Sequence, residues 1–302
     1  MQTVSRQAAA GGVLLTTLFW AGNAIVARGM IDDIPPITLA FWRWVVALLV
    51  ILPFGLRHVI REWKELVAAF WPLAVLGLLS VSVFNTLLYL SAHSTTAINL
   101  VLVNSSLPLV TLVLSWALLA QRPHWNEFVG IALATLGLVI VLVRGDYANL
   151  LAMRLSSGDT VMLAAVFSWA LYSVLLTRWP LKLHVFTMFT TMMVIGVVAL
   201  LPFYWVEYRA VGGIGFTGSQ VAIFVYVGVL ASAAAHIFWY YGVNALGPTT
   251  TSMFTYLIPV FTVILAYLIL NEALFSFHLA GGVLIFLGFV ISTVMFRRAR
   301  PD

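Results

Sequence analysis

The chain has 302 residues, of which 63% are hydrophobic and only 8% are charged. A water-soluble domain carries roughly a quarter of its residues as Asp, Glu, Lys and Arg, so this composition excludes a soluble globular protein. The formal charge of +5 does not indicate nucleic-acid binding, because the basic residues are spread over predicted loops and helix ends.

Apolar runs of about 20 residues, the length at which a helix crosses roughly 30 Å of hydrocarbon, recur along the whole sequence. The runs are too long for barrel strands and do not alternate apolar with polar residues. We therefore predict an all-α membrane protein with ten transmembrane helices. The predicted spans are 13–31, 37–55, 71–92, 95–120, 125–144, 158–178, 184–205, 219–245, 249–271 and 277–296.

The distribution of Lys and Arg predicts the orientation, because cytoplasmic loops carry the excess of these residues. With the N-terminus in the cytoplasm, ten basic residues face that side, four face the other, and Arg43 remains inside the second span. We expect a multi-pass protein of the cell inner membrane with both termini cytoplasmic. The ten are Arg6, Arg57, Arg61, Lys64, Arg122, Arg178, Lys182, Arg297, Arg298 and Arg300, and the four are Arg28, Arg144, Arg154 and Arg209.

An internal repeat divides the chain into residues 1–147 and 148–302, each with five predicted helices. An odd number of helices per repeat inverts the second repeat relative to the first. Inverted repeats are typical of transporters that open to alternate sides around a midplane site, although duplicated halves also occur in other membrane proteins. A shift of 151 residues aligns Gly77 with Gly228, Tyr89 with Tyr240, Pro108 with Pro259, Thr111 with Thr262, Gly130 with Gly281 and Gly137 with Gly288, and a slightly smaller one aligns Trp20 with Trp169.

Two prolines, Pro108 and Pro259, lie inside predicted spans at equivalent positions of the repeat. Each proline lacks an N–H and displaces the carbonyl four residues earlier, which belongs to Asn104 or Thr255. Freed carbonyls at membrane depth need a protein partner or a wet cavity. We expect helix breaks here that line a transport pathway, and a simple packing kink is the alternative.

Aromatic and polar residues inside the spans are the candidates for a pocket, because their N–H and O–H groups need partners. Neither Asp nor Glu lies near the centre of a predicted span, so a site for neutral or zwitterionic substrates fits better than one for lipophilic cations. Helices 1, 3, 4, 6, 8 and 9 would surround the pocket, with helices 5 and 10 as scaffold. The predicted substrate-binding residues are Trp20, Asn23, Asn85, Tyr89, Asn99, Asn104, Ser105, Trp169, Tyr172, His236, Tyr240 and Tyr256.

Three residues with basic side chains are predicted to be buried, namely Arg43, His93 and His236, and two of them allow more than one interpretation. His236 aligns with Asn85 in the repeat and could couple proton movement or donate a hydrogen bond between helices. Arg43 could snorkel or pair within the bundle, with a substrate carboxylate as the less favoured partner.

Gly130 and Gly137, repeated as Gly281 and Gly288, recur every seven residues on one face of helices 5 and 10. Small residues allow helices to approach closely, so we expect packing within the chain, with a dimer contact as the alternative and a monomer as the default.

The sequence lacks the motifs of membrane and soluble hydrolases, such as HExxH and GxSxG, and it contains no cysteine. We therefore expect neither enzymatic activity nor a metal or organic cofactor.

Five segments carry a family resemblance: LFWAGNAIVAR, LAFWRWVVALLVILPF, LVNSSLPLVTLVLSWALL, FSWALYSV and TYLIPVFTVILAYLILNEAL. Their order and spacing resemble the EamA branch of the drug/metabolite transporter superfamily, with ten helices in two five-helix repeats. The chain looks most similar to the YddG-type aromatic amino acid exporters, which implies Trp169, Tyr256 and Asn104-Ser105 as pocket residues. Those exporters carry bulky aromatics before the helix 4 proline, where this chain has Ser105, Ser106 and Leu107, which implies a wider pocket.

The resemblance implies an inner-membrane exporter of amino acids, aromatic and other neutral ones, and of similar metabolites. Its partners would be the small-molecule substrate and membrane lipid, without nucleic acid. A multidrug or other small-metabolite exporter is the first alternative, although the helix 1 glutamate of small multidrug exporters is missing. A non-transporting membrane assembly protein is the second.

Overall fold

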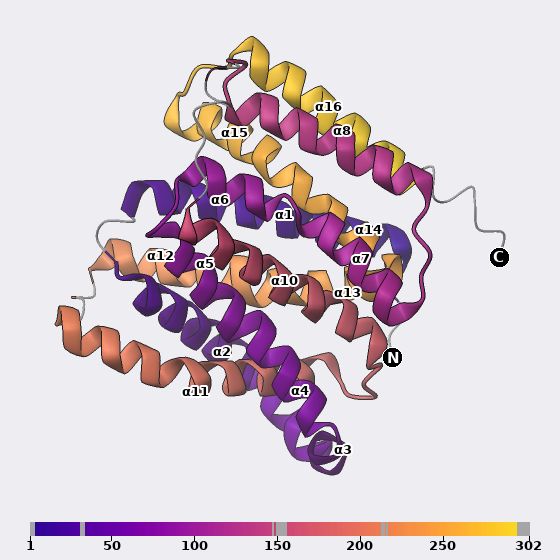
Figure 1. Ribbon diagram of the computed structural model, residues 1–302. Helices are drawn as coiled ribbons and strands as arrows, with labels where there is room; N and C mark the ends of the chain where they lie inside the picture. The colour runs from indigo at the N-terminus through magenta and orange to yellow at the C-terminus, as the bar shows by residue number, and fades with distance from the viewer. Residues whose placement is uncertain are drawn as a thin grey trace.

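The computed structural model describes residues 4–30, 34–146, 148, 156–212, 215 and 217–294, and this part of the chain contains no strand (Figure 1). Within it, nine helical stretches are long and apolar enough to cross a membrane. The first helix, α1, is not among these nine, but its 25 residues span about 37 Å, which is also enough. The predicted fold class, an all-α membrane protein of ten transmembrane helices, is confirmed.

Several spans are composite. The predicted span 71–92 contains a π-helical segment, η1, and the span 219–245 contains another, η2. The spans with the two prolines are broken, and α3 forms where we predicted a loop. The elements are α1 Arg6–Met30, α2 Pro36–Arg61, α3 Trp63–Ala68, α4 Phe70–Gly77, η1 Leu78–Val83, α5 Phe84–Ala92, α6 Ala97–Asn104, α7 Leu107–Leu119, α8 Trp125–Leu142, α10 Ser157–Arg178, α11 Val185–Val211, α12 Gly218–Gly228, η2 Val229–Ala234, α13 Ala235–Leu246, α14 Pro248–Met253, η3 Phe254–Tyr256, α15 Leu257–Leu270 and α16 Ser276–Val294.

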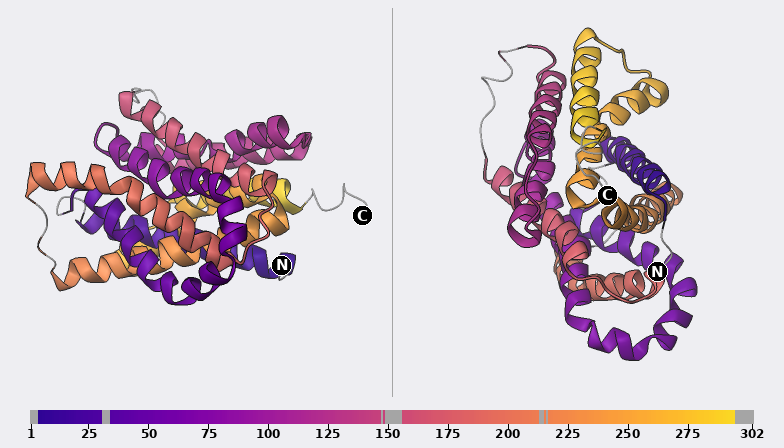
Figure 2. Two further views of the ribbon diagram at one scale, coloured as in Figure 1. Left: turned by 90° about the horizontal axis from the view of Figure 1, so that it is seen from below. Right: turned by 90° about the vertical axis from the view of Figure 1, so that its right-hand side faces the viewer.

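The pairing of α8 with α16 displays the inversion of the two repeats. A Cβ atom at Gly130 would lie 2.6 Å from the Gly288 carbonyl oxygen, and one at Gly137 would lie 2.5 Å from that of Gly281. The earlier glycine of α8 thus meets the later glycine of α16, so the helices are antiparallel. The repeat aligns Gly130 with Gly281 and Gly137 with Gly288, and it therefore exchanges the two contacts. The glycine faces pack against each other within the chain, at one edge of the molecule (Figures 1 and 2).

A second antiparallel pair, α2 and α11, is held by reciprocal caps. Glu207, near the end of α11, accepts hydrogen bonds from the backbone N–H and the hydroxyl of Thr38 at the start of α2. Glu62, directly after α2, accepts from the His184 N–H and the Thr187 hydroxyl at the start of α11. Burial alone would raise the pKa of Glu62, but these hydrogen bonds and the nearby histidines lower it. The carboxylates occupy helix N-termini, where the helix dipole favours negative charge.

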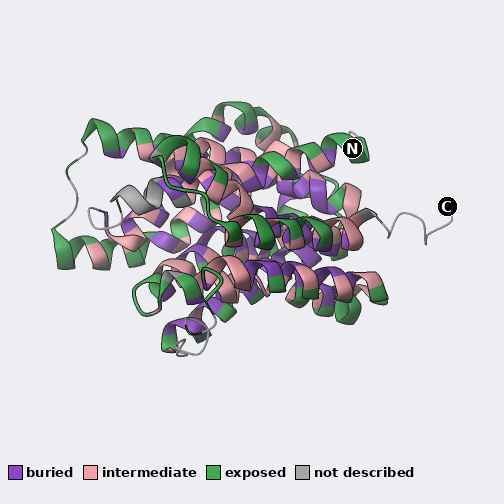
Figure 3. Cartoon of the chain, turned by 90° about the horizontal axis from the view of Figure 1, so that it is seen from above, coloured by how far each residue is buried: buried purple, intermediate pink, exposed green. Residues whose placement is uncertain are grey.

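The two repeats interlock instead of lying apart. Helix α1 packs against α13 and α15 of the second repeat, and α10 packs against α5 and α7 of the first. Figure 3 shows buried residues on the helix faces turned inward and exposed residues on the outer faces. The outer faces are themselves apolar, with Leu49, Val198 and Leu279 each more than 60% exposed, as expected for contact with lipid.

The start of α1 and the end of α16 lie at the same end of the bundle, as ten crossings require (Figure 1). The side chain of Arg28, and Arg154, Arg297, Arg298 and Arg300, lie outside the described residues. The predicted boundary between the two repeats, between residues 147 and 148, borders residues outside the described part of the chain and stays a prediction.

Replacing Gly137 with Ala should destabilise the protein by about 1–3 kcal/mol, because the new methyl group would overlap the Gly281 carbonyl. Gly282→Ala is the matched control on α16, where the methyl group meets no atom within 4 Å and should stabilise the helix slightly. Thermal unfolding in detergent measures both. Equal unfolding temperatures for the two variants would contradict the close approach of α8 and α16.

Candidate functional site

The two π-helical segments occupy equivalent positions of the two repeats, and each is capped by the equivalent polar residue. The Asn85 amide donates to the Ser80 and Val81 carbonyls, both at 3.0 Å. His236, which the repeat aligns with Asn85, has Nδ1 2.8 Å from the Ser232 carbonyl oxygen. A carbonyl only accepts, so Nδ1 carries the proton and Nε2 is the acceptor in the neutral ring. Short π segments inside α-helices often mark functional sites.

Three tryptophans meet beside these segments, one from the first repeat and two from the second. The ring centres of Trp20, Trp169 and Trp239 lie 5.4–5.6 Å apart in each pair. Tyr172 lies 5.2 Å from Trp169, and His236 lies 5.0 Å from it. The cluster thus joins α1, α10 and α13, and we call these five residues the aromatic centre.

Four buried polar atoms in or beside the aromatic centre have no hydrogen-bond partner among the described residues: Trp44 Nε1, Trp169 Nε1, the Tyr172 hydroxyl and His236 Nε2. The Trp44 ring lies 4.7 Å from the His236 ring, so these atoms belong to one region, where the Ser80 carbonyl also lies close to His236. Buried polar groups are nearly always paired in proteins, by protein, water or ligand. Two indole N–H groups, a hydroxyl and the second imidazole nitrogen are thus unpaired within the described part of the chain.

Arg43 lies next to the aromatic centre and is only 4% exposed. Its Nε donates to the Ser232 hydroxyl at 2.8 Å, and its Nη1 donates to Asn85 and Tyr89. Its Nη2 donates to the Ala231 carbonyl, which also accepts from the Trp20 indole N–H. The predicted pairing within the bundle is thus what the structure contains, and it links both π segments.

The structure brings together seven of the predicted binding residues around this region. Trp20, Trp169, Tyr172 and His236 lie in the aromatic centre, and Asn85 and Tyr89 hold Arg43. Asn23 follows Trp20 by one turn on the same helix face, is half-buried and makes no hydrogen bond to the described residues.

Other predicted residues are engaged elsewhere. The Asn99 amide donates to Asp159, which lies ten residues, or about 15 Å along α10, from Trp169. The Tyr256 hydroxyl is 2.9 Å from the Thr135 hydroxyl on α8.

In both proline segments, a side-chain hydroxyl pairs a backbone carbonyl of the preceding turn. The Ser105 hydroxyl donates to the Leu102 carbonyl, and Thr255 donates to that of Ser252. Pro108 lies in the first turn of α7 and Pro259 in the first turn of α15. The Asn104 side chain, half-buried before the break, has no hydrogen bond to the described residues.

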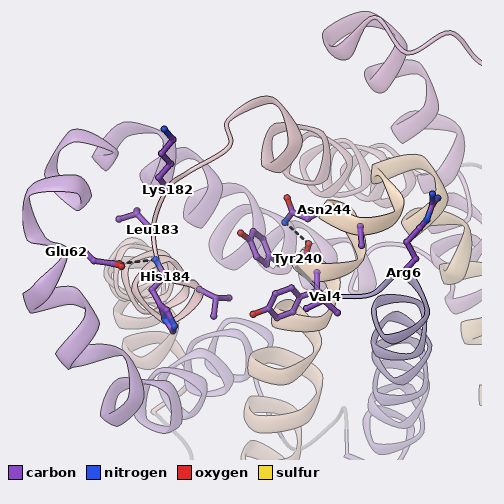
Figure 4. A pocket seen from close by; sticks show the side chains of 11 residues that line it. Val4, Arg6, Glu62, Lys182, Leu183, His184, Tyr240 and Asn244 are labelled. Carbon is purple, nitrogen blue, oxygen red and sulfur yellow. Dashed lines mark hydrogen bonds between the residues drawn. The ribbon is translucent and has the colours of Figure 1, made fainter. Parts of the chain in front are cut away.

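A cavity of about 980 Å³ opens at the end of the bundle where α1 begins. In Figure 4, Glu62 and His184 lie on one side of it, and Arg6 and Tyr240 lie on the other. Tyr240 follows His236 by one turn on the same face of α13, so the cavity ends about 6 Å along the helix from the aromatic centre. Burial and the neighbouring His58 lower the pKa of His184, which leaves Arg6 and Lys182 as the cations of this mouth.

Sequence reasoning missed Arg43 as a centre of the site, as well as the unpaired indole of Trp44. Arg43 was the one basic residue left inside a span by the charge count, and that was the signal. The described residues contain no group of three His, Asp or Glu suited to a metal ion.

Comparisons with known proteins give the family. The sequence profile of the EamA-like transporter family matches residues 8–143 and 156–294, one stretch per repeat. The chain belongs to this family. It is a membrane transporter.

Relatives of this transporter match over most of their length. An uncharacterized transporter of Archaeoglobus fulgidus is 29% identical over 286 residues, covering 92% of this chain and 95% of that one. The protein PecM of Dickeya dadantii is 27% identical, covering 81% of each chain. A solved crystal structure superposes with a TM-score of 0.79 at 18% identity, covering 98% of this chain and 100% of the other, which establishes the shared fold.

Replacing His236 with Asn should preserve stability, because Asn85 caps the equivalent segment with its amide. His236→Leu should cost about 0.5–1.5 kcal/mol, since it removes the hydrogen bond from Nδ1 to the buried Ser232 carbonyl. Thermal unfolding distinguishes the two variants. Because His236 is engaged beside the Arg43 cation, we also expect the Asn variant of this transporter to keep the wild-type pH profile of transport. A flattened profile would instead support proton coupling through His236.

Proposed function

We propose that this transporter exports amino acids, aromatic and other neutral ones, and similar small metabolites across the cell inner membrane by alternating access. The observation that carries the proposal is the aromatic centre with its unpaired polar atoms, built where the two repeats meet. Small-molecule sites combine apolar and aromatic walls with a few convergent polar groups, and inverted-repeat transporters bind substrate at the repeat interface.

The charges around the aromatic centre support a neutral or zwitterionic substrate such as an amino acid. The acidic residues that the structure describes lie near helix ends, as Glu62, Asp159 and Glu207 do in their caps. A site for lipophilic cations would need an anion at membrane depth, so a multidrug exporter of cations is less favoured. The unpaired polar atoms also disfavour a non-transporting assembly protein, whose core would be expected to satisfy them.

A difference between the repeats supports alternating access. Near the chain ends, α7 packs against α14, and the Thr249 hydroxyl donates to that of Ser115 at 3.3 Å. The repeat maps this pair onto Ile98 and Ala266, on α6 and α15, which do not pack in the same way among the described residues. The two repeats thus adopt different packings. If they exchanged these packings, the site would close to one side of the membrane and open to the other.

The excess of basic residues supports a cytoplasmic location of this end of the bundle, where the 980 Å³ cavity opens. Substrate would then enter from the cytoplasm along the face of α13 that carries Tyr240. The glycine faces of α8 and α16 pack against each other, which supports a monomer as the working unit. Ser105 and Ser106 before the break support a substrate range wider than aromatic amino acids.

The test is efflux of labelled phenylalanine and threonine from proteoliposomes. We expect flux well above protein-free liposomes, and Trp169→Phe should raise the KM about tenfold, because it keeps the ring but removes the unpaired N–H. Trp71→Phe is the matched control, at a ring that is 76% exposed on the outer face, and should change the KM less than twofold. Absence of flux for every amino acid tried would sink the proposal.

A further inference from the structure

Arg43 is a buried cation with no counter-charge among the residues that the structure describes. Its four hydrogen bonds go to a hydroxyl, an amide, a phenol and a carbonyl, all of them neutral. None of the carboxylates that the structure describes forms an ion pair with it; those near the inner and outer surfaces, such as Glu62 and Glu207, cap helices instead. Buried charges in proteins are normally paired, and an ionisable group inside a membrane span is normally functional.

The guanidinium also has binding capacity left. It carries five N–H groups in a planar fork, and four of them are used, which leaves one N–H on Nη2. The Arg43 Cζ atom lies 5.7 Å from the centre of the Trp44 ring, whose N–H is unpaired. Free donors and an uncompensated positive charge therefore occur side by side.

The ligand that satisfies this arrangement carries a negative charge and several acceptor oxygens. The one free N–H of the guanidinium can donate to one carboxylate oxygen, and such charge-assisted hydrogen bonds are among the strongest in proteins. The Trp20 indole N–H and the Arg43 guanidinium donate to the same carbonyl, that of Ala231, so the aromatic centre is adjacent to the guanidinium. An apolar or aromatic side chain attached to the carboxylate would lie against these rings.

We propose that Arg43 binds the carboxylate of the transported molecule and thereby restricts this transporter to substrates that carry a carboxylate. The inference rests on the proposed function and adds its specificity-determining residue. The LPF segment at 52–54 recurs at 201–203, and this shift of 149 residues maps Arg43 onto Met192, a buried apolar residue. Only one repeat therefore supplies the cation. The substrate consequently binds in one orientation, with its carboxylate toward α2 and its side chain toward Trp169.

A purely structural role is the competing explanation, because Arg43 also connects Ser232 of one π segment with Asn85 after the other. The two explanations differ in one measurable respect. A structural arginine affects all ligands alike, whereas a carboxylate-binding arginine affects acids and leaves their amides unchanged.

The experiment compares phenylalanine with phenylalaninamide as competitors of labelled phenylalanine transport in proteoliposomes. In the wild type the amide should compete at least about tenfold more weakly than the acid, the usual effect of losing hydrogen bonds to a charged group. Arg43→Gln should weaken competition by the acid by a similar factor, so that acid and amide compete about equally. Arg43→Lys keeps the charge and should retain the preference for the acid. Arg209→Gln, at an exposed arginine beside Trp205, is the matched control and should behave as wild type.

A wild type that accepts acid and amide equally would overturn the role of Arg43 while leaving amino acid transport intact. So would an Arg43→Gln variant that loses both compounds in parallel, or inorganic phosphate competing as strongly as phenylalanine. If Arg43→Gln does not fold, the wild-type preference and the Arg43→Lys variant decide between the explanations. Failure of the proposed function looks different, because no amino acid would then be transported by the wild type.

Discussion

The guanidinium of Arg43 connects the two repeats at the place where the backbone of both is irregular. Inside hydrocarbon, no water is available to pair a carbonyl or a charge, so the protein must supply every partner itself. Asn85 and His236 pair carbonyls of η1 and η2, and Arg43 binds Asn85 on one side and Ser232 on the other. Because its partners are all neutral, the same arrangement that holds the repeats together leaves a positive charge available.

Features shared by both repeats build the scaffold of this molecule, and residues present in only one repeat give the site its chemistry. The glycines of α8 and α16, the glutamate caps of α2 and α11 and the two π segments occur in both repeats and build the scaffold. The residues that give the centre its chemistry are not symmetric, since Arg43 corresponds to Met192 and His236 to Asn85. Two repeats that can exchange their packings therefore surround a site that binds its ligand in one orientation. This combination suits a transporter that must bind one end of a substrate specifically and still open to both sides.

The membrane class, the ten spans and the inversion were predictable because each depends on composition, length and repetition along the chain. The π segments were not, because a π turn differs from an α turn by one residue in its hydrogen bonding, and no local signal in 78–83 or 229–234 marks it. Asn99 looked like a pocket residue because it is polar inside a span, yet it binds Asp159 from a distant part of the sequence. The value of Arg43 was underestimated for a similar reason: a single sequence does not reveal whether a carboxylate from another helix will reach a buried arginine.

The central claim is that a ligand binds where the two repeats meet, and the cysteine-free chain allows a direct measurement. A single cysteine in place of Asn23, one turn from Trp20, should react with a water-soluble thiol reagent, and saturating phenylalanine should slow that reaction. Leu15→Cys, on the outer face of the same helix, provides the unprotected reference. A cysteine at position 23 that reacts no faster than the one at position 15, or at the same rate with and without ligand, would contradict the account.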